Sequence, residues 1–320
     1  MTQKITIIKL LCLLLFLQQI TIVPVSAAAR VFLCSRLEFT PALLDMLRRS
    51  VGRTLGINDA VILQPLQDTA SLAREASGSL ILIEHGMDIS FLPHGYQVSA
   101  THIDLVWVLV ASMRVPGLPI TSSLGGEEFA TLLHELKEQS PDCYPWFESL
   151  SSRVTLRNFD ILFKYALAQD TALTPATASS AAKPFWQQSD SIISLYRAIE
   201  EHLLNPFSIE ADLGLAMNVF EAGDAMFVSQ WVPAEFLDDD RLCRENMGKV
   251  RLLPFPLLNN QKYLRIRLCL CTSEQVDQNT PAADAHPPDE RFIDLDYIAD
   301  MEWIEKMAAD RYDALIMGGF

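Results

Sequence analysis

The first part of the chain alternates short apolar segments with helical patterns. Three segments have the length and composition of buried strands: residues 30–34, 59–66 and 79–84. Residues 41–53 predict a helix with Leu43, Leu47 and Val51 on one face, and a shorter helix is expected near 69–76. This β-α-β-α-β order predicts an α/β fold in which a parallel sheet is covered by helices on both faces.

In a parallel sheet of this kind, ligands bind at the carboxyl ends of the strands. Three segments lie at such ends here: residues 35–38, 65–68 and 84–88. Side chains in these segments are therefore the first candidates for a binding site.

Further elements follow along the chain. Residues 103–111 form a continuous apolar run of buried-strand length, and residues 127–138 and 189–204 have the period of amphipathic helices. An acidic helix is expected at 295–311. Two segments read as surface loops: the Ala/Thr/Ser tract 171–183 and the Pro/Asp-rich tract 272–290.

Composition and charge limit the classes of molecule that the chain is expected to bind. The chain has 320 residues, of which 50% are hydrophobic and 20% charged, enough for one or two sizeable cores. Its 25 Lys and Arg against 40 Asp and Glu give a formal net charge of −15. That excess of negative charge argues against nucleic acid and anionic membrane surfaces as partners.

The N-terminal segment has the pattern of a secretory signal peptide. Lys4 precedes an apolar run at 10–17, and small residues at 25–29 offer a cleavage site after Ala27 or Ala29. The alternative is an uncleaved membrane anchor, which Gln18, Gln19 and Pro24 disfavour because they interrupt the apolar run. We therefore expect residues 1–29 to direct the protein to the periplasm or the extracellular space.

Five cysteines follow the signal segment, at positions 34, 143, 243, 269 and 271. An odd number leaves at least one thiol free in an oxidising compartment. Alternation in 263–271 places Cys269 and Cys271 on the same face of a strand, about 6.6 Å apart. Because that spacing is near the limit for a disulfide, buried or separately paired cysteines are favoured over a Cys-x-Cys metal site.

The most specific stretch is 211–256, ADLGLAMNVFEAGDAMFVSQWVPAEFLDDDRLCRENMGKVRLLPFP. It predicts a helix, a turn at 221–224, a strand at 225–231, a helix and a second strand. This order resembles the carbohydrate-type extracellular solute-binding proteins of ABC importers. The positions that carry the resemblance are Phe220, Gly223, Ala225, Met226, Trp231, Val250, Pro254 and Pro256.

The resemblance implies a two-lobed, type II periplasmic-binding-protein-like fold, each lobe a mainly parallel sheet flanked by helices. Residues 30–115 with 262–320 are expected to form lobe 1, and 116–261 lobe 2, so that the chain crosses twice between them. A small polar solute between the lobes and the membrane permease of an ABC importer are the implied partners.

Sugar recognition combines aromatic faces with polar groups for the hydroxyls. The resemblance places Tyr144, Trp146 and Trp231 as stacking residues. Trp231 has an equally good alternative as a core residue that ends a buried strand. Trp146 and Tyr144 follow Pro141 in a segment without periodicity, which favours exposure over core packing.

Arg36, Glu84 and Asp104 are the polar candidates for contacting the same solute. Arg36 and Glu84 follow or end the first and third strands, where ligands collect. Asp104 lies on a strand expected to be buried, where an unpaired charge is costly. It therefore either contacts the ligand or forms a salt bridge with an arginine.

No catalytic or metal-binding pattern rises above chance. Ser180 and Lys183 match Ser-x-x-Lys, but they lie in the low-complexity tract and lack a Lys-Thr-Gly partner. The histidines 85, 94 and 102 have no metal-ligand spacing. We expect no enzymatic activity, no metal and no cofactor.

The sequence thus predicts an exported sugar-binding protein of an ABC importer. The alternative is an exported interaction or sensor protein that keeps this fold but acts through a protein partner without transport. It is motivated by the unusual residues at the first and third strand ends and by the tract 272–290. In that case the side chains at the strand ends should pair with one another.

Overall fold

The computed structural model describes residues 29–35, 37–56, 61–65, 80–90, 92, 94–116, 124, 126–169, 191–256, 262–272 and 289–295. Five sequence predictions lie wholly or mostly outside these residues: the signal segment 1–29, the helix near 69–76, the tracts 171–183 and 272–290, and the helix 295–311.

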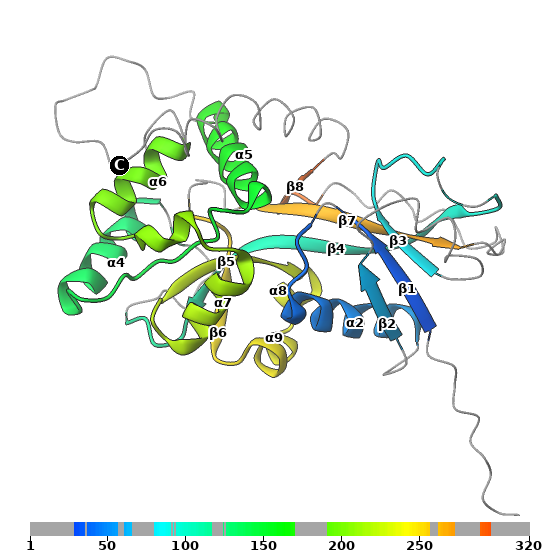
Figure 1. The fold of residues 1–320 in the computed structure, drawn as a ribbon, viewed down its shortest axis with the longest axis horizontal. Helices are drawn as coiled ribbons and strands as arrows, with labels where there is room; N and C mark the ends of the chain where they lie inside the picture. Colours follow the sequence, from blue (N-terminus) through cyan, green and yellow to red (C-terminus); the bar gives the residue numbers. More distant parts are fainter. Residues whose placement is uncertain are drawn as a thin grey trace, which may run out of the picture.

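A single mixed sheet runs through the described residues (Figure 1). Its eight strands are β1 (Ala29–Cys34), β2 (Val61–Pro65), β3 (Leu80–Glu84), β4 (Gln97–Ser112), β5 (Phe227–Pro233), β6 (Val250–Leu253), β7 (Tyr263–Thr272) and β8 (Phe292–Asp294). The strand order is β2-β1-β3-β7-β4-β5, with β6 paired to β4 and β8 to β7.

Strand directions confirm part of the fold prediction and correct part of it. β1 pairs in parallel with β2 and β3, as the β-α-β-α-β order predicts. The pairs β3·β7, β4·β7, β4·β5 and β4·β6 are all antiparallel. The α/β class is therefore confirmed, but the sheet is mixed rather than mainly parallel. β7 runs antiparallel to β3 and β4 and parallel to β8, and β4 runs antiparallel to β5 and β6.

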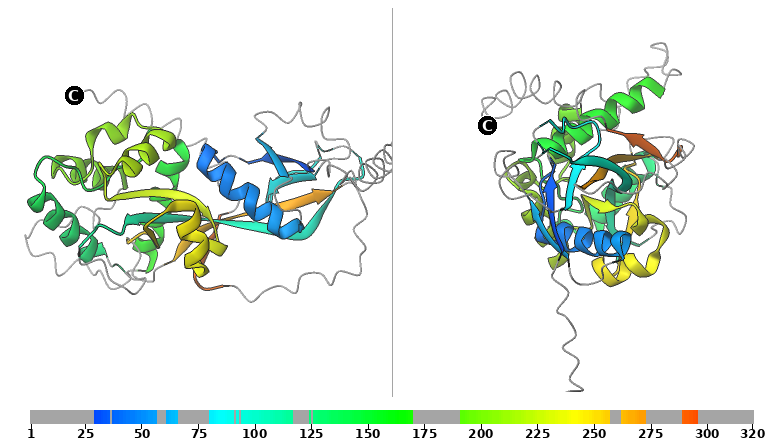
Figure 2. Two further views of the ribbon diagram at one scale, coloured as in Figure 1. Left: turned by 90° about the horizontal axis from the view of Figure 1, so that it is seen from below. Right: turned by 90° about the vertical axis from the view of Figure 1, so that its right-hand side faces the viewer.

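The two longest strands join the ends of the molecule. β4 has 16 residues and β7 has 10, and both run lengthwise between β1–β3 at one end and the helices at the other (Figures 1 and 2). β4 extends beyond the predicted 103–111 because Gln97 and Val98 pair with the end of β7. Its apolar stretch from Leu105 to Ala111 is 0–2% exposed, so this stretch forms the centre of the core.

Most of the helices lie at the end opposite β1–β3 (Figure 1). The described helices are α2 (Pro41–Leu55), α4 (Gly126–Gln139), α5 (Arg153–Gln169), α6 (Ser191–Glu200), the 3₁₀ turn η3 (Pro206–Ile209), α7 (Leu213–Ala222), α8 (Glu235–Asp238) and α9 (Asp240–Met247). Of these, α2, α4 and α6 confirm predicted helices, whereas α5 is absent from the sequence predictions. Within the described ranges, none of the helices has the length and apolarity needed to span a membrane.

Local sequence signals explain the ends of α2. The Thr40 side chain accepts a hydrogen bond from the Leu43 amide at 3.1 Å, and Pro41 occupies the first turn. Gly56 ends the helix in the left-handed conformation, with φ 67°. The apolar face packs on the sheet, where Leu43, Leu47 and Val51 are 0–1% exposed.

The stretch 211–256 folds in the predicted order: α7, β5, α8 with α9, and β6. Asp212 caps α7 by accepting from the Leu215 amide at 2.7 Å. Gly223 ends α7 with φ 86° and turns the chain into β5, whose seven residues are all buried.

The described cysteines are unpaired. Cys34, Cys243, Cys269 and Cys271 are buried and Cys143 is exposed, and none forms a disulfide. Cys34, Cys269 and Cys271 belong to one apolar cluster on a face of the sheet. Burial raises the pKa of all three thiols, that of Cys271 to about 12, and keeps them protonated. In the described residues, no group of His, Cys, Asp or Glu is arranged to hold a metal ion.

We expect Gly223→Ala to destabilise the fold by about 1–2 kcal/mol, the cost of a left-handed conformation for a residue with a Cβ. The added Cβ would also lie 3.0 Å from Nη1 of Arg114. Gly214→Ala is the matched control, because Gly214 lies inside α7 and there alanine should be neutral or stabilising. Urea denaturation followed by circular dichroism measures both, and equal effects would contradict the role given to Gly223.

Candidate functional site

The carboxyl ends of β1 and β3 bring two predicted-site segments together. Ser35, just after β1, donates to Oε1 of Glu84 at 2.5 Å. Glu84 ends β3 and is 1% exposed. The two strand ends therefore meet as expected, but the Glu84 carboxylate is held inside the protein. Arg36 lies outside the described residues.

Asp104 is held by two arginines from β7. Its Oδ2 accepts from Arg265 at 3.2 Å and its Oδ1 from Arg267 at 3.1 Å. Arg265 also binds Asp294 through two nitrogens, at 2.5 and 2.9 Å, which lowers the pKa of that carboxyl. The salt-bridge alternative for Asp104 is confirmed, and its contact with a solute stays a prediction.

Tyr144 is the one predicted aromatic residue that is partly exposed. The ammonium nitrogen of Lys137 lies 4.6 Å from the ring centroid, and the ring of His202 makes an edge contact at 6.3 Å. A solute role for Tyr144 remains a prediction.

The exposure predicted for Trp146 is wrong. Its side chain is 1% exposed, and its backbone makes strand-like bridges to Leu204 and Phe227. The ring packs in an aromatic cluster with Phe129, Phe159 and Phe255, at centroid distances of 5.6–6.1 Å. Trp146 therefore presents no face on which a sugar can stack.

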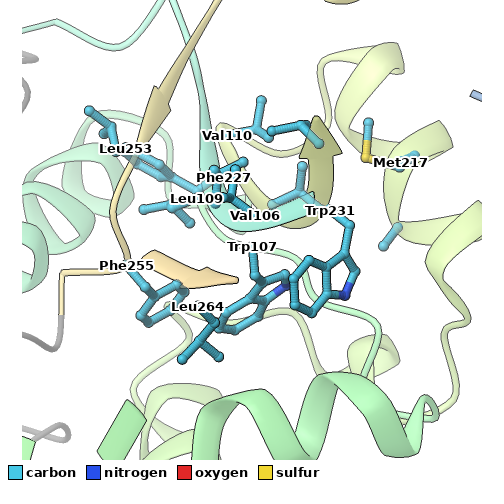
Figure 3. Packing of buried hydrophobic residues seen from close by; sticks show 14 of the residues in the cluster. Val106, Trp107, Leu109, Val110, Met217, Phe227, Trp231, Leu253, Phe255 and Leu264 are labelled. Atoms are coloured by element: carbon cyan, nitrogen blue, oxygen red, sulfur yellow. The ribbon is translucent and has the colours of Figure 1, made fainter. Parts of the chain in front are cut away.

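Trp231 is a core residue, which was the alternative to its predicted stacking role. It lies opposite Trp107 in the β4·β5 register and is 2% exposed (Figure 3). Trp107 in turn stacks on Phe255, with ring centroids 5.3 Å apart. The stacking role that the resemblance implies for Trp231 is contradicted by this burial.

Sequence reasoning missed a buried acid close to these tryptophans. Glu148 is 0% exposed and accepts from Nε1 of Trp146 at 2.6 Å and from Oγ of Ser229 at 2.5 Å. Loss of hydration dominates over these hydrogen bonds and raises its pKa from 4.5 to about 7. Its position two residues after Trp146 was the one sign in the sequence that the two side chains could interact. It was missed because the segment was predicted to be an exposed loop.

A small pocket with a volume of about 90 Å³ lies between α2 on one side and α7, β5, α9 and β6 on the other. Ala42, Asp45 and Met46 of α2 form one wall. The other is formed by Met217, Phe220 and Glu221 of α7, Gln230 of β5, Asn246 and Met247 of α9, and Val250 of β6. We call this the α2–α9 pocket. None of the residues that line it was predicted as a site residue.

Hydrogen bonds and an ion pair hold several polar side chains of the α2–α9 pocket in place. Arg49 bridges the rim by donating to Asp45 at 2.8 Å and to Oδ1 of Asn246 at 2.7 Å. Gln230 is 3% exposed, and its amide nitrogen donates to the sulfur of Met247 at 3.8 Å. A sulfur is a weak acceptor, so this amide retains hydrogen-bonding capacity. The pocket thus combines carboxylates and amides with an apolar lining.

Comparison with known proteins gives matches in structure only. No protein-family model matches the sequence, and no curated protein matches it in sequence. The chain is similar to MalE3 of T. maritima solved with maltose, at 12% identity over 90% of this chain and 80% of that one, with a TM-score of 0.45. It is also similar to a sugar transporter protein of Bacillus licheniformis solved with stachyose, at 12% identity, 88% and 78% coverage and a TM-score of 0.43.

A third similar structure is an ABC transporter solute-binding protein of Thermotoga lettingae bound to α-D-tagatose. Identity is 10%, the match covers 78% of this chain and 73% of that one, and the TM-score is 0.45.

We expect Trp146→Phe to destabilise the protein by about 1–3 kcal/mol more than Trp231→Phe. Both rings are equally buried, but Nε1 of Trp146 binds Glu148, whereas Nε1 of Trp231 finds no hydrogen-bond partner in the described part of the chain. Urea denaturation of the two variants checks this difference. Equal losses would mean that the bond to Glu148 contributes nothing measurable.

The raised pKa of Glu148 predicts a pH dependence of stability. The folded state holds this proton more tightly than the unfolded chain, so the contribution is greatest below pH 4.5 and falls as the pH rises to about 7. The full change is roughly 3 kcal/mol, at about 1.4 kcal/mol per pH unit. Glu148→Gln should remove this slope from denaturation curves measured between pH 4.5 and 7.5, and the exposed control Glu200→Gln should keep it.

Proposed function

We propose that the protein is an exported solute-binding protein that captures a small polar solute, a sugar, between two lobes for the membrane permease of an ABC importer. The lobes in this proposal are residues 30–115 with 262–320, and residues 116–261. The observation that carries it is the α2–α9 pocket, because one wall comes from the first set of residues and the other from the second.

The chemistry of this pocket supports a sugar as the solute. Asp45 and Glu221 supply carboxylates, and Gln230 and Asn246 supply amides. Asp45 and Asn246 already bind Arg49, and Asn246 also donates to the Leu242 carbonyl, so a sugar hydroxyl has to share or replace these contacts. Phe220 lines the pocket but is only 8% exposed, so α2 has to move away before this ring can contact the C–H side of a pyranose. No catalytic step is part of the proposal.

The size of the pocket implies movement during binding. A volume of about 90 Å³ holds a few water molecules, whereas sites for small organic ligands span roughly 300–1,000 Å³. Entry of a sugar therefore requires α2 to separate from α7 and α9. In this proposal, the chain passes between the lobes after β4 and again before β7. Because β4 also pairs with β5 and β6, the movement has to bend this shared sheet as well as the two crossings.

Export rests on the pattern in residues 1–29, with Lys4, the apolar run 10–17 and the small residues before Arg30. Periplasmic or extracellular localisation and the permease are parts of the same proposal.

One observation favours the alternative, an exported interaction protein that works through a protein partner without transport. The polar groups predicted to meet the solute already bind one another or their neighbours: Ser35 binds Glu84, and Asp104 binds Arg265 and Arg267. A pull-down from membranes, with small-angle scattering in the presence and absence of sugars, separates the two functions. Contraction on adding a sugar supports solute capture.

We expect a neutral mono- or disaccharide to raise the melting temperature in a screen that also contains amino acids and metal salts. A ligand at 100 times its Kd adds about 2.7 kcal/mol of stability. Asn246→Ala and Gln230→Leu should each weaken binding about 3- to 10-fold through a lost hydrogen bond. Asn218→Ala is the matched control, because Asn218 lies exposed on α7 and does not line the pocket.

Two results would contradict this proposal. One is a complete screen in which no sugar raises the melting temperature. The other is a sugar that binds Asn246→Ala and Gln230→Leu as tightly as the unmodified protein, which would place the solute elsewhere.

A further inference from the structure

A second and larger cavity lies beside β6, at the edge of the sheet. Its volume is about 420 Å³, and its walls come from α8, α9, β6 and the residue after β4. We call it the β6 cavity. It shares only Val250 with the α2–α9 pocket. Its size lies within the range of sites for small organic molecules.

The floor of the β6 cavity is apolar. Phe236 and Leu253 belong to the main core and are each 2% exposed, and Leu252 packs against that core. Met113, half-exposed at 50%, extends the apolar surface to the mouth of the cavity. A ligand with an apolar portion can therefore bury it here.

The rim of the β6 cavity is cationic. Arg244, Lys249 and Arg251 line it, and Asp240 is the single carboxylate among its lining residues. This balance is unusual in a chain whose formal net charge is −15. It gives the cavity a local positive potential.

Four carboxylates near Arg244 and Lys249 bind groups elsewhere, which leaves Asp240 as the carboxylate that lines the cavity with them. Those so engaged are Glu235 with Arg53, Asp238 with Arg291, Glu245 with Arg241, and Asp239 with the first amides of α9. Arg244 donates to the backbone oxygen of Asp240 at 3.2 Å. In the part of the chain that the structure describes, no ion pair joins Arg244 or Lys249 to a carboxylate. These cations are available to an anion from solution.

We propose that the β6 cavity binds a small organic anion, a carboxylate or phosphate monoester carried on an apolar body. The apolar body lies on Phe236 and Leu252, and the anionic group binds Arg244 and Lys249 at the rim. Charge-assisted hydrogen bonds from guanidinium and ammonium groups select the anion, and the apolar floor selects the organic ester over inorganic phosphate. This site is separate from the α2–α9 pocket and does not depend on the sugar-binding proposal.

The test is calorimetric titration of the purified protein with phenyl phosphate, with inorganic phosphate and benzyl alcohol as the two half-probes. Phenyl phosphate should bind at least tenfold more tightly than either, and its affinity should fall as salt is raised. Arg244→Gln with Lys249→Gln should lower the affinity at least tenfold. Both side chains are exposed, so the double variant should keep its circular dichroism spectrum.

Arg241→Gln is the matched control, since Arg241 lies on the same helix, is 82% exposed and does not line the cavity. Asn246→Ala should also bind phenyl phosphate normally, so failure of the sugar site and failure of this site are distinguishable. The proposal is overturned if phenyl phosphate does not bind. It is also overturned if the double variant binds it like the unmodified protein, or if either half-probe binds equally well.

Discussion

Between β4 and β7, the Asp104 carboxylate binds the guanidinium groups of Arg265 and Arg267 at the middle of the two longest strands. Such partly buried ion pairs add little net stability, but removal of one partner leaves a poorly compensated charge behind. They therefore favour one register of this strand pair. The register matters because β3 pairs with β7, and β5 and β6 pair with β4. Both ends of the molecule depend on this central pairing.

Much of the fold could be predicted, for identifiable reasons. α2 has a capping threonine, a proline in its first turn and a terminal glycine, and each acts through local geometry. In the stretch 211–256, Asp212 caps the start of α7 and Gly223 ends it in the same way. The direction of β7 could not be derived, because an alternating strand pattern carries no information about its neighbours. α5 has a capping serine, Ser152, which accepts from the Thr155 amide at 3.3 Å, but buried polar residues such as Arg157 and Asn158 obscure its apolar period.

The predicted site fared less well because exposure is a tertiary property. Trp146 stands in a segment without helical or strand periodicity, yet bridges to Leu204 and Phe227 fix it under the aromatic cluster. Asp104 was predicted as a charge on a buried strand and Glu84 as a polar group at a strand end, but Arg267 of β7 and Ser35 after β1 supply their partners. The lining of the α2–α9 pocket comes from five separate elements, and no single stretch of sequence carries its pattern. Sequence periodicity predicts elements, whereas pockets arise from how those elements meet.

The buried thiols have a consequence for the order of events after synthesis. Cys34, Cys269 and Cys271 are shielded only once β1, β3 and β7 have paired, and β7 begins at Tyr263, far along the chain from the end of β3 at Glu84. Contacts between such distant segments form late, because loop closure opposes them. In an oxidising compartment the unfolded chain exposes every thiol to disulfide exchange until then. For the exported protein proposed above, correct maturation therefore requires this sheet to close before Cys34, Cys269 and Cys271 oxidise. Folding then buries these three thiols, whereas Cys143 stays exposed.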